Sequence, residues 1–147
     1  MNNCGKLVVK MGLLSLLSVM PLAAQIDNGV AFTAPFPFYA GNVELPGGSY
    51  KLTQLNINAQ ALLLRNSAST DGVFLYFIPT RSADPYRESD VTFDKIGDTG
   101  YLRALSVGGE TDGIAFRRSK AEKKAAATAT VAENTTVVEH ATLVRGE

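Results

Sequence analysis

The most constraining feature of this sequence is an apolar segment that contains two prolines, residues 30–38, with the sequence VAFTAPFPF. Apolar side chains recur at every second position from Val30 to Phe38, which is the period of a strand with one buried face. Pro35 and Pro37 lie on the opposite phase. Because N–H groups alternate in direction along a strand, both prolines remove donors on one side only. The segment therefore predicts an edge strand with one neighbour, whose phenylalanines fill the core.

Short apolar segments separated by turn residues continue along the chain, without a long helical period. The predicted strands cover residues 43–45, 50–53, 61–65, 73–79, 91–96, 101–107 and 114–116. The predicted turns lie at residues 40–42, 45–48, 56–58, 66–72, 97–100 and 108–113, with a polar loop at 80–90. At residues 45–48 we expect a type II turn, because Pro46 presets φ at its second position and Gly47 supplies the positive φ of its third.

These alternations predict an all-β fold, a small antiparallel β-sandwich or barrel of about 7–8 strands with a short C-terminal helix and a flexible tail. Residues 73–79, VFLYFIP, are apolar on both phases and predict a central strand with both faces covered. The periodicity of this segment is also compatible with a buried helix. Its β-branched and aromatic residues, and Pro79 at its end, favour the strand.

After the predicted β domain, residues 25–118, the composition changes. Ser119 and Glu122 have the spacing of a helix capping box, and alanines follow, so we expect a short helix over residues 119–127. Residues 128–147 are rich in Ala, Thr, Val and Glu without a core pattern, which predicts a disordered tail. The alternative is a late strand at residues 136–144, because β-branched residues there favour extension.

The first 24 residues have the pattern of a secretory signal peptide. Lys6 and Lys10 precede an apolar stretch that ends in small residues, and we expect cleavage after Ala24. The stretch is shorter than the roughly 20 apolar residues that span a bilayer; an uncleaved anchor is the alternative. Cleavage would remove Cys4, the one cysteine of the chain, so the mature domain would be free of disulfides. We expect a secreted or periplasmic protein without stable membrane insertion.

The order of these motifs resembles a family of short secreted proteins found in acidobacteria. The resemblance rests on the Pro-Phe-Pro-Phe-Tyr-Ala-Gly and Leu-Pro-Gly-Gly-Ser-Tyr motifs at residues 35–50, TFDKIGDTGYLRAL at 92–105 and GIAFRRSKAEKKAA at 113–126. It covers residues 32–126 and leaves out the tail. Where family members tend to have Leu-Pro-Ala-Gly, this chain has Gly47 in place of the alanine. The resemblance implies a β fold and export, and it assigns no activity and no catalytic residue.

The tripeptide Asp98-Thr99-Gly100 has the spelling of an aspartic peptidase motif. Such enzymes pair two aspartates that share a proton and activate water. A single copy would need a dimer to supply the second aspartate, and here the motif lies late in the chain. A hairpin turn explains the same residues, since Asp and Gly are common in turns for backbone reasons. We expect the turn.

The other polar groups predict no catalytic, cofactor-binding or metal-binding residue. His140 is the one histidine and lies in the predicted tail. The carboxylates Asp84, Glu88 and Asp90 alternate with arginines and miss the calcium-loop spacing. Tyrosines 39, 76 and 86 could stack on sugars or peptides, but the chain has no tryptophan. Arginines 117 and 118 and lysines 120, 123 and 124 are balanced by acidic residues, with 14 basic and 14 acidic residues overall, which argues against nucleic-acid binding.

From these observations we expect an exported, non-enzymatic β domain that acts by binding an unknown protein or glycan, or as a structural component of the envelope. Two other classes are weighed against it. One is a secreted aspartic peptidase that uses Asp98 in a dimer. The other is a small outer-membrane β-barrel, which the alternating strands permit but the Arg-Gly-Glu terminus and the predicted helix fit poorly.

Overall fold

The structure is a computed structural model, and it describes residues 29–56 and 60–144. Ten strands and two helical segments follow one another along the chain. They are β1 (Gly29–Ala34), β2 (Phe38–Ala40), β3 (Val43–Leu45), β4 (Gly48–Asn56), β5 (Ala61–Asn66), β6 (Gly72–Arg81), β7 (Asp90–Ile96), β8 (Thr99–Ser106), β9 (Asp112–Phe116), α1 (Lys120–Thr128), the 3₁₀ turn η2 (Val131–Glu133) and β10 (Asn134–Val144). The predicted all-β class is confirmed.

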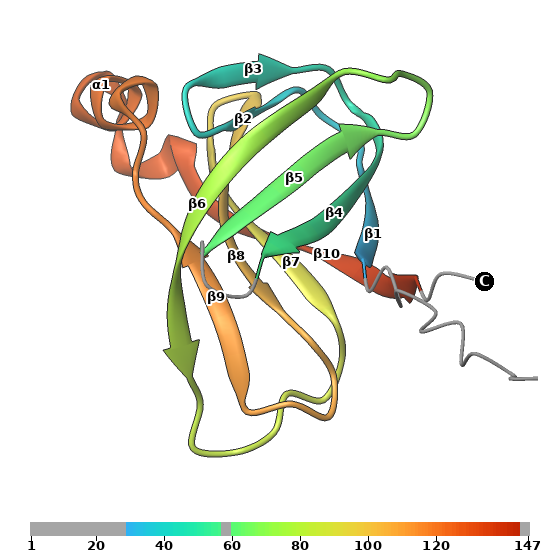
Figure 1. Ribbon diagram of the computed structural model, residues 1–147. Helices are drawn as coiled ribbons and strands as arrows, with labels where there is room; N and C mark the ends of the chain where they lie inside the picture. The colour runs from blue at the N-terminus through green and yellow to red at the C-terminus, as the bar shows by residue number, and fades with distance from the viewer. Residues whose placement is uncertain (1–28, 57–59, 145–147) are drawn as a thin grey trace, which may run out of the picture.

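Eight of the strands close into an antiparallel barrel, and two further strands extend it. Around the barrel the order is β8, β7, β10, β1, β4, β5, β6 and β9, and the β8–β9 pairing closes the ring (Figure 1). The two further strands are the short hairpin β2–β3. Strand β2 pairs with β8 in parallel, and β3 pairs with β2 in antiparallel fashion. The hairpin therefore extends the wall on one side of β8, beyond the closed ring.

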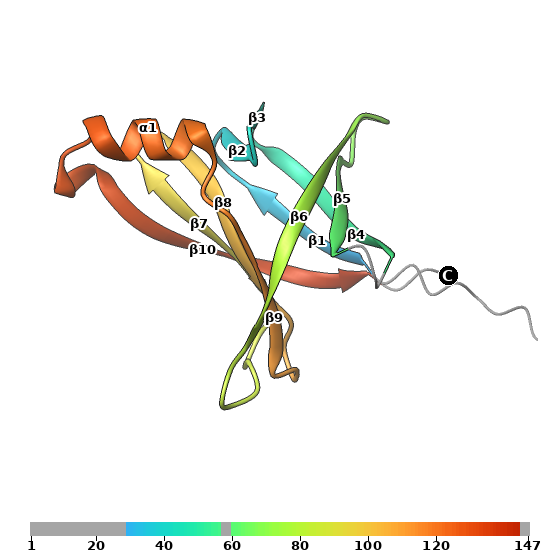
Figure 2. The same ribbon diagram turned by 60° about the vertical axis from the view of Figure 1, so that its left-hand side comes forward.

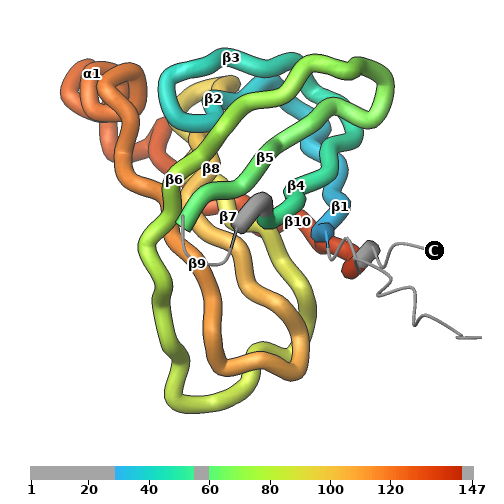
Figure 3. The backbone as a smooth tube through the Cα atoms, viewed as in Figure 1, coloured from blue at the N-terminus to red at the C-terminus, as the bar shows by residue number. Residues whose placement is uncertain are grey.

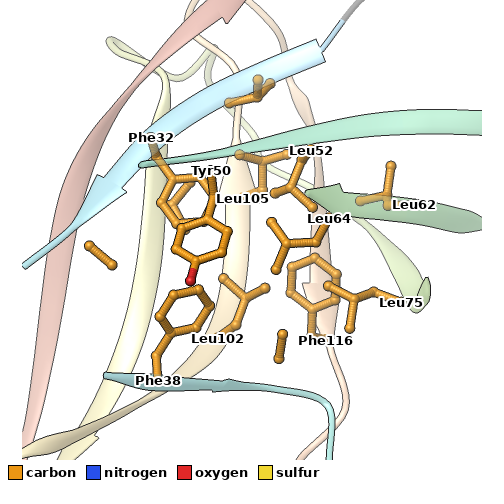
Figure 4. Close-up of a cluster of buried hydrophobic side chains, with 14 of the residues drawn as sticks. Phe32, Phe38, Tyr50, Leu52, Leu62, Leu64, Leu75, Leu102, Leu105 and Phe116 are labelled. Atoms are coloured by element: carbon orange, nitrogen blue, oxygen red, sulfur yellow. The ribbon is translucent and has the colours of Figure 1, made fainter. Parts of the chain in front are cut away.

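The barrel interior is filled by side chains, among which the rings of Phe32, Phe38 and Tyr50 lie together (Figure 4). The Phe38 ring lies 5.0 Å from that of Tyr50 and 5.3 Å from that of Phe93, both in edge-to-face contact. Phe32 stacks on Tyr50 at 5.9 Å. Edge-to-face and stacked pairs add about 0.5–1.5 kcal/mol to the burial of each ring pair. The predicted aromatic core is confirmed for Phe32 and Phe38, which are buried, while Phe36 is half-buried against Phe93.

The predicted edge strand is wrong in one respect, because β1 has two neighbours. It pairs with β4 over its whole length and with β10 over Gly29–Phe32. The strand ends at Ala34, so Pro35 and Pro37 lie in the break before β2 and remove no donor from the ladder. The Pro37 carbonyl instead accepts a hydrogen bond from the Gly100 amide at 3.0 Å. The prolines end a strand of the barrel wall; they do not protect a sheet edge.

Glycine has different roles in three of the predicted turns. Gly41 and Gly97 have φ values of +63° and +61°, which confirms the hairpin turns at β2–β3 and β7–β8. Gly47, expected to adopt a positive φ, does not. A Cβ atom at Gly47 would lie 3.2 Å from the carbonyl oxygen of Ala34. Glycine is needed there because two backbone segments approach closely, and the type II turn prediction is wrong.

Residues 73–79 do form a strand, but the prediction that both of its faces are covered is wrong. Leu75 is buried, whereas Phe74 and Tyr76 are 65% and 77% exposed. The inward phase of β6 contacts the core, and the outward phase carries aromatic side chains on the surface. Apolar character on both phases here reflects an exposed apolar surface, not a buried position.

The C-terminal part is more ordered than expected. Helix α1 begins after Ser119, whose side-chain oxygen accepts the Glu122 amide at 3.0 Å, so the helix prediction is confirmed. The prediction of a disordered tail is wrong for residues 134–144, which form β10 between β7 and β1. Val137 pairs with Phe93 and Ala141 with Phe32. This long-range pairing satisfies the backbone of a segment whose own pattern is too weak to predict it.

Figure 2 shows α1 beside β7 and β10, and Figure 3 follows the chain from β9 through α1 into β10. None of the helices within residues 29–56 and 60–144 is long and apolar enough to cross a membrane. The predicted signal peptide at residues 1–24 lies outside the described residues. The predicted reversal at residues 56–58 does so in part, since β4 ends at Asn56 and β5 begins at Ala61.

Candidate functional site

At the end of the barrel that carries the β2–β3 hairpin, two strand edges lack a strand partner (Figure 1). Among the described strands, β3 pairs only with β2. Strand β6 pairs with β5 over Gly72–Tyr76 and with β9 from Phe77 onward, so no strand of the described residues pairs with its β9-side edge over Gly72–Tyr76. We call the space between β3 and this first half of β6 the slot.

Two backbone hydrogen bonds show which main-chain groups of β6 face the slot. The Phe77 amide donates to the Gln60 carbonyl at 3.0 Å, on the β5 side. The Ser82 amide, at the end of the strand, donates to the Thr111 carbonyl at 2.8 Å, on the β9 side. Main-chain groups alternate in direction along a strand, so odd-numbered residues face β5 and even-numbered residues face the β9 side. The amide and carbonyl of Phe74 therefore face the slot.

A cavity of about 720 Å³ occupies one end of the slot. Val43 and Leu45 of β3 line one side, Val73 and Phe74 of β6 the other, and Tyr50 lies between them. Ligand cavities in proteins commonly measure about 300–1,000 Å³ and are mostly apolar with a few polar groups. Asn66, Ser69 and Asp71 supply polar groups at this end. The cavity has the size and the lining of a binding site.

The slot continues into a second cavity of about 390 Å³. Val43, Val73 and Phe74 line both cavities, so the two share a wall. The far end of the second cavity is lined by Arg117 and Arg118, which follow β9. The slot thus has an apolar middle, a carboxylate at the Gly72 end of β6 and guanidinium groups at the Tyr76 end.

Several exposed apolar side chains of the described residues lie on β3 and β6, the two strands that border the slot. Val43 is 45% exposed, and Phe74, Tyr76 and Ile78 project from the outward phase of β6. Exposed aromatic residues next to a cavity are typical of protein-binding surfaces, where aromatic side chains supply most of the binding energy.

Tyr50 closes the inner side of the larger cavity. Its hydroxyl donates to the Pro46 carbonyl at 2.6 Å. Burial raises the pKa of Tyr50, against a smaller lowering by its hydrogen bond to Asn66. The tyrosine is therefore a neutral, fixed wall and not an acid or base for chemistry at neutral pH.

A second group of polar side chains lies under α1. The Arg103 guanidinium donates to the Asp94 and Glu122 carboxylates, the latter at 2.6 Å, and Arg118 lies 3.4 Å from Glu122. Burial raises the pKa of Glu122, while Arg103 and Arg118 oppose the rise and Asp94 adds to it. A cavity of about 310 Å³ adjoins the group between α1, β7 and β10. Because each carboxylate already has a guanidinium partner, the arrangement docks the helix and leaves no group poised for catalysis.

A third group contains the histidine. His140 was expected in a solvated tail, but β10 pairs it with Asp90 across the strands. Its Nδ1 atom lies 3.1 Å from an Asp90 oxygen and 3.2 Å from a Glu88 oxygen. These three residues could each offer one ligand atom to a metal ion, within 4.8 Å of one another. The His140 side chain is 81% exposed, so its contacts with the two carboxylates lie at the surface, where such contacts contribute little to stability.

The remaining sequence candidates do not come together. Asp98 is exposed in the β7–β8 hairpin turn, beside Gly97, as the turn interpretation predicts. Tyr39 stacks on Tyr101 at 5.4 Å and donates to Glu44, so its ring is already covered on one side. Asp84 lies in an exposed loop.

Sequence reasoning missed the slot as a whole. Its signal was present in residues 73–79, where apolar residues occupy both phases of a strand. We attributed that pattern to burial on both faces, and the exposed aromatic phase is its actual cause. The opposite wall, β3, was predicted as a brief strand, but local sequence does not reveal which edges face each other.

Comparison with protein-family models, curated proteins and solved structures finds no match to this chain. The resemblance to short secreted acidobacterial proteins therefore stays a prediction.

Proposed function

We propose that this protein is an exported, non-enzymatic binding domain that holds an apolar segment of a partner protein in the slot. One observation carries the proposal: Phe74, which lines the cavity of about 720 Å³, and Tyr76, which lines the adjoining cavity of about 390 Å³, are 65% and 77% exposed. Exposing two aromatic rings to water is unfavourable, and a partner that covers them gains about 25 cal/mol for each Å² of apolar surface removed from water.

A protein partner suits this surface better than a glycan. The middle of the slot is formed by aliphatic and aromatic side chains, and polar groups lie only toward its ends. Sugars need several hydrogen-bonding groups along the site together with a flat aromatic platform. Tryptophan is the residue best suited to form that platform, and this chain has no tryptophan. Export is proposed from residues 1–24, and mass spectrometry of the protein from the culture medium or periplasm should give Gln25 as the first residue.

The experiment is to apply the labelled protein to peptide and glycan arrays and to compare three forms. The unmodified chain is expected to bind apolar peptides. The double variant Val43→Ser/Phe74→Ser should lose that binding, because both sides of the slot lose apolar surface. Val138→Ser is the matched control, since Val138 is also half exposed but lies on β10, away from the slot.

Three results would contradict the proposal. The first is binding to glycans alone, and the second is peptide binding that the double variant retains. The third is hydrolysis of the arrayed peptides, which would make the protein an enzyme; the Asp98→Asn variant would then show whether the Asp-Thr-Gly turn is responsible.

A further inference from the structure

We infer that the slot accepts one extended strand of the partner, which pairs with the open first half of β6 in antiparallel fashion and extends the barrel wall toward β3. This inference rests on the proposed function and specifies the ligand chemistry of the same site. The starting point is the unpaired edge of β6 over Gly72–Tyr76, with the Phe74 main chain directed into the slot.

The chemistry that complements an open strand edge is another main chain. Backbone N–H and C=O groups are strong hydrogen-bonding groups. One edge presents the groups of every second residue, along a strand that rises about 3.3 Å per residue. Addition of a strand to such an edge is a common mode of peptide recognition, in which main-chain bonds give affinity and alternate side-chain pockets give specificity. A small apolar molecule would fill the cavities but leave the Phe74 groups unmatched.

The other half of β6 shows that an edge of this strand can be protected when it is not used. Over Phe77–Arg81 the unpaired side is the β5 side, which the odd-numbered residues face. Pro79 has no N–H to offer on that side. Arg81 nearby keeps a charge on the strand and pairs with Asp112 across the β6–β9 ladder at 2.8 Å. Proline and charged residues are the devices that block pairing at sheet edges. The slot-facing edge has neither over Gly72–Tyr76.

The directions of the strands determine how a partner strand fits. Strand β6 is antiparallel to β9, and β9 is antiparallel to β8. Strand β8 is parallel to β2, and β2 is antiparallel to β3. It follows that β3 and β6 run in opposite directions, so a strand between them is antiparallel to one and parallel to the other. The open edge of β6 is longer than β3, and antiparallel pairing is slightly more stable per residue. The partner is therefore antiparallel to β6.

The side-chain pattern of the partner follows from this register. Residues opposite Val73 and Leu75 point inward, toward the two cavities, and should be apolar. The first partner residue lies near Tyr76 and Arg117, and the last lies near Gly72 and Asp71. An acidic residue at the start and a basic residue at the end complement these charges. The expected pattern is Glu-x-Thr-x-Lys with apolar x.

The test uses acetylated and amidated peptides Glu-x-Thr-x-Lys, in which each x is Val, Leu, Ile or Phe, titrated into the isotopically labelled full chain and followed by NMR. We expect binding with shifts at Phe74 and Val43. Phe74→Pro should raise the dissociation constant about tenfold relative to Phe74→Thr, the loss of about one hydrogen bond. Both variants lack the aromatic ring, and only the proline variant lacks the slot-facing N–H.

A second measurement does not depend on the folding of a variant. N-methylation of the central threonine of the peptide removes the donor that faces the Phe74 carbonyl, and it should weaken binding to the unmodified protein about tenfold. The inference is overturned if none of the peptides binds, or if binding is unchanged by both the proline substitution and the N-methyl group. If the arrays show peptide binding that needs the slot residues but is insensitive to these main-chain changes, only this inference fails. If the arrays show no peptide binding that depends on the slot residues, the proposed function itself is contradicted.

Discussion

The first half of β6 (Gly72–Tyr76) pairs with β5 and the second half (Phe77–Arg81) pairs with β9, so within residues 29–56 and 60–144 each half has one edge without a strand partner. The two edges differ in their residues. Pro79 removes a donor from the open edge of the second half, whereas the open edge of the first half keeps the N–H of Phe74 and borders apolar cavities. The difference teaches that an unpaired edge is not by itself a binding site. An edge that keeps its donors beside an unfilled apolar space is a candidate for one.

The largest expected effect separates the two sides of the first half. Leu75→Pro removes an N–H that faces β5 and a buried side chain, and it should lower the free energy of unfolding by about 3 kcal/mol or more. Phe74→Pro removes an N–H that faces the slot, and it should cost about 1 kcal/mol or less. Urea denaturation of both variants checks this. Equal losses would mean that the Phe74 amide is bonded within the fold.

The second effect compares a ring in the core with a ring at the slot. Phe93 is fully buried, and Phe93→Ala should lower the free energy of unfolding by about 3–5 kcal/mol. Phe74→Ala should change it by less than about 0.5 kcal/mol, because that ring makes few contacts to lose. The same denaturation curves give both values. A loss above 2 kcal/mol at Phe74 would assign its ring to folding and not to binding.

A smaller, pH-dependent effect concerns Glu122 in α1. This helix follows Arg118, which lies at the Tyr76 end of the slot. Burial raises the pKa of Glu122 above its usual value of 4.5. The folded protein therefore binds this proton more tightly than the unfolded chain, so the resulting stability is present below pH 4.5 and is lost as the pH rises through the raised pKa.

Glu122→Gln, which cannot titrate, should remove this dependence. The melting temperature of the variant relative to the unmodified protein should rise as the pH is raised from about 4 to about 7. Thermal unfolding at several pH values measures the difference, and Glu133→Gln is a control on an exposed glutamate of the neighbouring turn η2. A difference that stays constant with pH would show that Glu122 does not have a raised pKa.

The smallest effect on stability is expected at the blunted edge. Pro79→Val restores a donor to the open edge of the second half and should leave the free energy of unfolding within about 0.5 kcal/mol. It should nevertheless promote association between molecules, because the edge can then pair with another chain. Analytical ultracentrifugation over a range of concentrations checks this. A monomeric Pro79→Val variant would show that the proline does not protect the edge.

Much of the fold could be predicted from local patterns. The period-2 alternation identifies Phe32 and Phe38 as core residues, and the capping box identifies α1, because both depend on residues close in sequence. Pairing partners could not be predicted, since they depend on contacts between distant segments. For this reason β1 was predicted at an edge and β10 was predicted to be disordered, although the two pair with each other in the barrel wall.

A proline does remove donors on one side of a strand in this fold, but in β6 and not in β1. Pro35 and Pro37 follow β1 and end it, while Pro79 lies within β6 and blunts one edge. The candidate site was missed for a related reason. Apolar residues on both phases of a strand arise from burial on two faces or from one buried and one exposed binding face, and residues 73–79 do not distinguish these in sequence alone.

The central claim is that the main chain of Phe74 is left unpaired by the fold and faces the slot. Amide hydrogen exchange of the unliganded protein, read residue by residue by NMR, tests it most directly. The Phe74 amide should exchange much faster than the amide of Leu75, which faces β5 in the same strand. Equal protection of the two amides would contradict the claim, because it would mean that the edge is already occupied within the folded chain.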